Sequence, residues 1–257
     1  MEIVQHICMH SPAAREHAMR LLRANLNDCE VARRTGIART TIRDWRRPRY
    51  VPRTPPAARA VCPRCGQGAR AMSFAPGDYA ELLGLYLGDG HVVRMGRTYR
   101  LRLFLDLRHP LIIKESSELL SRCFPHNRVS QARPARYRMA ILSVYSSHLP
   151  CLLPQHGPGK KHERPIVLER WQEAHLSSSP WRFLKGCIRS DGSSFINRTG
   201  PYEYLSYEFT NHSSEILGLF CHTLDAVGVR YRRYERQVRI NRRASVALVE
   251  ANVGIKR

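Results

Sequence analysis

Acidic residues are scarce in this sequence. Its 257 residues include 21 Asp and Glu against 42 Lys and Arg, which gives a formal net charge of +21 at pH 7. Lysine is also rare, since only five of the 42 cationic residues are lysine. Coding bias can explain a preference for arginine over lysine, but it does not explain the missing acids. A charge of this size attracts polyanions, and because no basic amphipathic helix stands out, we expect nucleic acid rather than a membrane surface as the partner.

Long apolar segments are also missing. No apolar run approaches the ~18 residues that a membrane-spanning helix needs. The first ten residues, MEIVQHICMH, lack the charged start and apolar core of a signal peptide. The expected location is therefore the cytoplasm, with nucleoid association if the chain is bacterial. The hydrophobic fraction of 43% is typical of a globular protein rather than a disordered one.

The sequence has no need of a disulfide framework, because a chain of this length can bury its own core. Its eight cysteines are scattered, and only Cys62 and Cys65, in CPRCGQ, have a spacing typical of metal ligands. Structural zinc needs four ligands, and there is no second C-x-x-C. Two hypotheses stay open for this pair: Zn²⁺ bound together with distant His or Cys residues, or a turn with two free thiols.

Residues 12–47 predict a compact unit of three short helices. Asn27 or Asp28 can cap the second helix, and Gly36 permits a left-handed turn before the third, TTIRDWRR. A short helix, a glycine turn and an arginine-rich helix are typical of a helix-turn-helix, whose last helix enters the major groove. The alternative is an ordinary three-helix bundle with a solvated basic face. The candidate DNA contacts are Arg39, Thr40, Arg43 and Arg46, and the expected core residues are Ile37, Ile42 and Trp45.

The stretch LLGLYLGDG, residues 82–90, is matched by LKGCIRSDG, residues 184–192. Each is followed by two strand-like runs, an amphipathic helix and two more strand-like runs, so we predict an internal duplication over 78–254. The last run of the second copy, predicted as a strand, is QVRINRRASVALVE, residues 237–250. Arginines alternate with apolar residues in these strands, which is typical of a sheet with one face on helices and one basic face. The candidate DNA contacts on the basic face are Arg100, Arg102, Arg239 and Arg242.

Small residues recur four apart in each motif and therefore share one helix face. They are Gly84 and Gly88 in the first motif, and Gly186 and Ser190 in the second. Two helices packed through these faces would bring Asp89 and Asp191 side by side. The glycines that follow, Gly90 and Gly192, would supply the helix stops. Two carboxylates at two negative helix ends need a cation, and Mg²⁺, which prefers oxygen ligands, is the natural choice.

The segment PQHGPGKKHERP, residues 154–165, is predicted to connect the two copies because it is basic and rich in Gly and Pro. Two of its residues, His156 and His162, are candidates for proton transfer or metal binding. The alternative for the whole segment is a solvated basic linker. Its candidate phosphate contacts are Lys160, Lys161 and Arg164.

The paired motifs and the repeat order resemble those of the LAGLIDADG homing endonucleases in their single-chain form. The resemblance covers roughly residues 78–254. It implies an α+β fold of two pseudo-symmetric αββαββα halves around a central helix pair, with sheets that form a saddle over double-stranded DNA. It also implies a Mg²⁺-dependent cut of both strands, with the family's catalytic acids at Asp89 and Asp191. The N-terminal unit resembles the helix-turn-helix of resolvases and transposases, a small all-α module.

The second motif departs from the family pattern. Lys185, Cys187 and Arg189 stand where the family usually has apolar or small residues at the helix interface. The family often uses a basic residue near its metals, and the lysines nearest to plausible positions are Lys160, Lys161 and Lys185. The predicted domains are a helix-turn-helix module (1–47), a proline-rich linker with the CPRC motif (48–77), a first repeat (78–155), a basic connection (156–179) and a second repeat (180–257).

Three functions are compatible with these features. The leading prediction is a site-specific DNA endonuclease, because a protein that only binds DNA gains nothing from two juxtaposed acids. The alternative is a transcriptional regulator that binds DNA without cutting it, as the WhiA-type regulators do; the chain resembles them in combining the two domain types. A third class, the RNA-splicing maturases, shares the scaffold. We expect a monomer, because the duplication supplies an internal pseudo-dimer.

Overall fold

The computed structural model describes residues 11–46 and 75–256, which belong to two separate compact units. The zinc hypothesis concerns Cys62 and Cys65, which lie outside the described residues. No helix in the described ranges is long and apolar enough to cross a membrane.

The first unit is a three-helix domain. It contains α1 (Pro12–Arg23), α2 (Asp28–Thr35) and α3 (Arg39–Arg46). Asn27 caps α2, because its side chain accepts a hydrogen bond from the amide of Glu30, and Gly36 ends α2 in the left-handed conformation at φ 67°. Both features agree with the expectation from the sequence. The buried core consists of Ala18, Val31, Ile37 and Ile42, with Trp45 packed against it half-buried.

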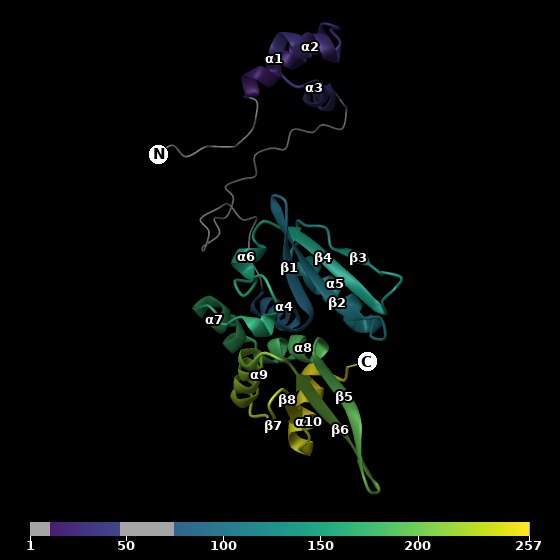
Figure 1. Ribbon diagram of the computed structural model, residues 1–257, viewed down its shortest axis with the longest axis vertical. Coiled ribbons are helices and arrows are strands. Elements are labelled where there is room, and N and C mark those ends of the chain that lie inside the picture. The colour runs from purple at the N-terminus through teal and green to yellow at the C-terminus, as the bar shows by residue number, and fades with distance from the viewer. Residues whose placement is uncertain (1–10, 47–74, 257) are drawn as a thin grey trace. The chain divides into compact units, whose positions relative to one another are not determined.

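The second unit is an α+β domain built from two copies of one arrangement, as predicted (Figure 1). The first copy comprises α4 (Pro76–Asp89), β1 (Gly90–Met95), β2 (Thr98–Asp106), α5 (Pro110–Cys123), β3 (Ser130–Ala132), β4 (Met139–Ser146) and α6 (Leu149–Leu152). A 3₁₀ turn (Lys161–Glu163) and α7 (Arg170–Ser178) follow. The second copy comprises α8 (Pro180–Arg189), β5 (Gly192–Thr199), β6 (Tyr202–Thr210), α9 (Ser214–Ala226), β7 (Arg232–Arg233), β8 (Gln237–Ile240) and α10 (Arg243–Val253).

Each copy forms a four-stranded antiparallel sheet, in the orders β1-β2-β4-β3 and β5-β6-β8-β7. In β2 the side chains of Leu101, Leu103 and Leu105 are buried in the core, whereas the residues between them are only half-buried. Because side chains alternate along a strand, Arg102 and Phe104 lie together on the opposite, open face of the sheet. Figure 1 shows α4 and α8 between the two sheets.

The predicted strand over 237–250 is confirmed at its start, where β8 covers Gln237–Ile240, and is wrong for the rest. Strand β8 ends at Ile240, and α10 begins at Arg243. The buried residues Val246, Val249 and Val253 recur at helical spacing, which places them on the core side of a helix. Arg242 therefore lies at the N-cap of α10 rather than on the basic face of a sheet.

The two motif helices pack at backbone distance. A Cβ atom on Gly84 would lie 2.5 Å from the carbonyl oxygen of Phe183. A Cβ on Gly186 would collide with the carbonyl oxygen of Glu81, and one on Gly88 would collide with the Ser190 side chain. The four small residues thus lie in the contact between α4 and α8, where any larger side chain would force the helices apart.

The glycines after the two aspartates have a role different from the one expected. Gly90 is extended, at φ −89° and ψ 148°, so it does not need the left-handed conformation of a glycine cap. A Cβ on Gly90 would lie 2.5 Å from the Cα of Tyr86, and one on Gly192 would lie 2.5 Å from the Cα of Ile188. Glycine is required at both positions because the chain folds back sharply there from a helix into a strand.

A buried polar network holds the connection between the copies on α4. The Tyr79 hydroxyl donates to the carbonyl of Leu152 at 2.7 Å and accepts from Nε2 of Gln172 at 2.7 Å. The amides of Gln155 and Gln172 also hydrogen-bond to each other. Because each of these buried groups has a partner, the segment after α6 has a fixed position beside the first turn of α4.

The helix contact gives the first prediction. Gly84→Ala should lower the free energy of unfolding by about 1–3 kcal/mol or more, because the new methyl group meets rigid backbone. Gly218→Ala is the matched control, since Gly218 lies within α9 with nothing within 4 Å of its would-be Cβ. The control should gain about 0.5–1 kcal/mol from helix propensity. Urea unfolding measures both, and equal effects would contradict the backbone contact.

Candidate functional site

The two motif aspartates meet where α4 and α8 end. Asp89 is the last residue of α4, and Asp191 lies between the end of α8 and the start of β5. A Cβ on Gly88 would lie 3.2 Å from Cγ of Asp191, so the second aspartate lies against the residue that precedes the first. The helix contact therefore brings the two predicted acids together.

Two lysines cap the ends of the motif helices. The ammonium group of Lys161 donates to the carbonyl oxygens of Tyr86, Leu87 and Gly88, at 2.7, 2.9 and 2.5 Å. The ammonium group of Lys256 donates to the carbonyl of Ser190, the C-cap of α8, at 2.5 Å and to that of Gly192, the first residue of β5, at 2.8 Å. Lys161 lies in the connection after α6, and Lys256 lies after α10. Each lysine thus follows the last helix of its own copy, so the two caps repeat with the fold.

These caps change the explanation for acids at helix ends. From the sequence we expected a metal ion to balance the negative helix ends. In the structure the ammonium groups of Lys161 and Lys256 are hydrogen-bonded to those helix-end carbonyls. Neither Asp89 nor Asp191 has a Lys or Arg nitrogen within 4 Å among residues 75–256. The carboxylates are thus left without a direct cationic partner.

Burial and mutual repulsion favour the protonated acids. Burial, followed by the charge of Asp191, raises the pKa of Asp89 to about 7. Burial also raises the pKa of Asp191, although Lys161 and a hydrogen bond from Asn211 oppose the rise. Burial lowers the pKa of Lys161 to about 8, against the attraction of both aspartates. Perturbed acids in such a cluster are typical of a functional site.

The surroundings of the two aspartates differ. Asn211 donates from Nδ2 to Asp191 at 2.6 Å, and its own oxygen accepts from the amide of Ser213, so its orientation is fixed. The neighbouring His212 has its ring 5.3 Å from that of His162, in the connection. No hydrogen bond reaches the Asp89 carboxylate from the described residues.

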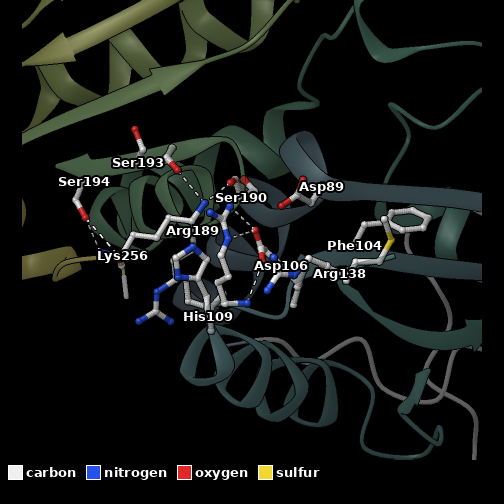
Figure 2. Close-up of a pocket in the computed structure, with 15 residues that line it drawn as sticks. Asp89, Phe104, Asp106, His109, Arg138, Arg189, Ser190, Ser193, Ser194 and Lys256 are labelled. Carbon is white, nitrogen blue, oxygen red and sulfur yellow. Dashed lines mark hydrogen bonds and ion pairs between the residues drawn. The ribbon is translucent and has the colours of Figure 1, made fainter. Parts of the chain in front are cut away.

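A pocket of about 630 Å³ opens beside Asp89 (Figure 2). It lies between the end of β2 and the start of β5, so both copies contribute to its wall. Asp106 in this wall is paired with Arg108 at 2.6 Å. Its cationic or potentially cationic lining residues are Arg108, His109, Arg138, Arg189 and Lys256.

The unusual residues of the second motif, Lys185, Cys187 and Arg189, all contact other parts of the domain. Lys185 lies 3.7 Å from the buried carboxylate of Glu81 on α4 and 3.4 Å from that of Glu115 on α5. Arg189 pairs with the same two acids. Cys187 is buried against α4. Lys185 therefore belongs to an ion-pair cluster along the helices and not to the aspartate pair.

The basic connection is only partly available to DNA. Lys161 is committed to α4, and Arg164 donates to the carbonyls of Gln155, Gly157, Pro158 and Gly159. Both residues form hydrogen bonds within the protein, and their contact with phosphates stays a prediction. Lys160 is exposed and can reach a phosphate. His156 bonds to the carbonyl of Leu153 within the loop.

The strand arginines occupy defined positions. Arg100 donates to the Ser143 hydroxyl at 2.9 Å, and Arg239 pairs with Glu208 at 2.9 Å. Arg102 stacks on the ring of Phe104. On α3 the side chains of Arg39, Thr40 and Arg43 are exposed, whereas Arg46 reaches Asp28 at 3.4 Å.

The aspartate pair suits a hard divalent cation in its donor chemistry. Asp89 presents a half-buried carboxylate that forms no direct ion pair with a described residue, and Asp191 presents a second one beside it. No group of three or more His, Cys, Asp or Glu residues converges on one point within 11–46 and 75–256. Phosphate oxygens or water would therefore have to complete the coordination shell, as is usual for Mg²⁺.

No protein-family model and no curated protein matches the chain. Mesophilic variants of the homing endonuclease I-DmoI are similar in structure, at 16% identity over 70% of this chain and 96% of the other, with a TM-score of 0.48. The full-length WhiA from Thermatoga maritima is 17% identical over 73% of this chain and 58% of its own, with a TM-score of 0.47. The homing endonuclease I-WcaI, bound to its DNA recognition sequence, is 11% identical over 72% of this chain and 85% of its own, with a TM-score of 0.46. These are the two groups that the motifs resemble, and the likeness is one of fold.

Sequence reasoning missed Lys256 and Asn211. Both lie far from the motifs in sequence and reach the aspartates only through the fold. A signal for Lys256 exists, since lysine is so rare here that each of the five invites a specific explanation. Asn211 has no comparable signal.

The raised pKa of Asp89 predicts a pH-dependent stability. Between its unfolded value of 3.8 and about 7 the folded state holds a proton that the unfolded state has lost, so stability falls as pH rises. Asp89→Asn should remove this loss of stability. Its free energy of unfolding should exceed that of the wild type by roughly 2–4 kcal/mol at pH 7.5, and the difference should be much smaller at pH 4.5. Urea unfolding in metal-free buffer measures it.

The control is Asp106→Asn, because hydrogen bonds from Arg108 lower the pKa of Asp106 to about 2. A lowered pKa has the opposite sign, so this variant should lose stability at neutral pH. If Asp89→Asn were destabilised at both pH values, the aspartate would be a structural cap.

Proposed function

We propose that this chain is a site-specific DNA endonuclease that depends on a divalent metal ion. The observation that carries the proposal is the pair Asp89 and Asp191, held together at two helix ends whose own charge the lysines Lys161 and Lys256 already balance. An arrangement that costs stability above pH 4 requires a use, and metal binding provides one.

The residues around the two aspartates would have different roles in cleavage. Asp89 and Asp191 would hold Mg²⁺, which supplies activation of water and stabilisation of the leaving oxygen in phosphodiester hydrolysis. Asn211 keeps the Asp191 carboxylate in one orientation. Lys161 and Lys256 place cationic groups beside the acids, where a phosphate would approach. The open sheet faces, with Arg100 and Arg102, would contact the DNA backbone and bases.

A regulator that binds DNA without cutting is the second candidate. One observation favours it: two ammonium groups and two carboxylates in one site are electrically balanced without any metal ion. The two functions differ in what the aspartates do, and cleavage decides between them.

Cleavage is tested on DNA selected from a randomised library, with Mg²⁺ or Mn²⁺ and with EDTA. Asp89→Asn and Asp191→Asn should each lower the rate of double-strand cleavage by orders of magnitude, because each half serves one strand. DNA binding should persist, since it depends on the basic sheets. If the wild-type protein binds its selected site tightly yet never cuts it with either metal, the regulator is the correct function.

The three-helix unit gives a separate prediction. Arg43→Ala should weaken binding to the selected site by about 1–3 kcal/mol, because Arg43 is exposed on α3, the helix proposed to enter the major groove. The matched control is Arg34→Ala on α2, since Arg34 is already paired with Glu30 at 3.0 Å. Anisotropy titrations measure both. Equal small losses would show that α3 does not read bases.

A further inference from the structure

Cationic groups gather on the open face of the first sheet. His91 on β1 is the register partner of Arg102 on β2, so the two side chains are cross-strand neighbours. Neither Arg102 nor Arg164 has a carboxylate oxygen within 4 Å among the described residues.

Arg102 is prepared for a ligand. Its Cζ lies 5.4 Å from the ring centroid of Phe104, two residues along the same face. Its Nε is buried, with no hydrogen-bond acceptor in the described part of the chain. An unpaired buried donor is costly, and an anion that accepts from it would recover that cost. A stacked guanidinium also has less conformational freedom to lose on binding.

The second copy lacks this arrangement. One residue after the motif glycine stands His91 in the first copy and Ser193 in the second. The register partners are Arg102 and Glu208 respectively. Glu208 accepts from Arg239, at 2.9 Å from Nη2 and 3.2 Å from Nε, so the charge of Arg239 is neutralised within the protein.

We propose that His91 and Arg102 form a binding site for one backbone phosphate of bound DNA, and that the second copy has no equal site. The inference rests on DNA binding as proposed above. A phosphate is favoured over a base because His91 follows Asp89 by two residues, which places the site beside the position where the DNA backbone would be cut. Lys161 adds positive charge nearby, because its ammonium group is bonded to the carbonyl of Gly88, three residues before His91.

The test is the salt dependence of binding by the full chain, measured by anisotropy with a labelled duplex of random sequence. Each phosphate contact contributes about 0.9 to the slope of log K against log salt. Arg102→Gln should lower the slope by about 1 and weaken binding roughly 10-fold at low salt. Arg102→Lys, which keeps the charge, should retain most of the slope and guards against a folding defect.

Arg239→Gln is the matched control, since Arg239 also lies beside an aromatic ring on a strand but has an acid partner. It should leave the slope nearly unchanged, and Glu208→Gln should raise it by freeing Arg239. Titration with inorganic phosphate at constant ionic strength separates the DNA backbone from free phosphate.

Failure of the wild type to bind any duplex would overturn the DNA-binding proposal as a whole. Binding by the wild type with an unchanged slope in Arg102→Gln would overturn the phosphate site alone. An unchanged slope, together with a lost preference for the library-selected site over the random duplex, would assign Arg102 to a base. Displacement of DNA by inorganic phosphate from the wild type but not from Arg102→Gln would assign the site to the free anion.

Discussion

The backbone contact between α4 and α8 determines the rest of the larger unit. Because Gly84 and Gly186 have no side chains, the two helices approach until backbone meets backbone. That contact fixes where both helices end, and the chain enters a sheet directly after each end. The positions of Asp89 and Asp191 follow from it, as do the positions of the two sheets on either side. A separation of the helices by one methyl group would disturb all of these together, because closely packed interiors transmit strain.

The ends of α4 and α8 carry two kinds of negative charge, the terminal carbonyls and the carboxylates of Asp89 and Asp191. The ammonium groups of Lys161 and Lys256 satisfy the terminal carbonyls, which removes most of the electrostatic cost of ending a helix next to an acid. The carboxylates remain beyond them, repelling each other and attracting protons or metal. In a chain with only five lysines, two are found at these caps.

The sequence predicts the duplicated α+β fold and the meeting of the aspartates, because small residues four apart and a repeated order of elements are local patterns. It fails for α10, where the valines sit in an arginine-rich run that also alternates like a strand. It also assigns Gly90 the wrong reason, since the requirement is the close approach of Tyr86 and not a left-handed backbone. Asn211 could not be predicted, because only the folded chain brings it to the site, and for Lys256 the sequence offers only the rarity of lysine as a signal.

The two copies share a backbone plan but differ in their chemistry. At matched register positions the first sheet has Arg102 without an acid partner, whereas the second has Glu208, which neutralises Arg239. Asp191 is oriented by Asn211, and no described residue orients Asp89 in this way. Symmetry in a DNA site mirrors symmetry in the protein that binds it, so a homodimer of identical halves favours a palindrome. Duplication within one chain removes that constraint, because each half can change by itself. For the DNA binding proposed here, the unequal faces of this domain therefore predict a target whose two half-sites differ.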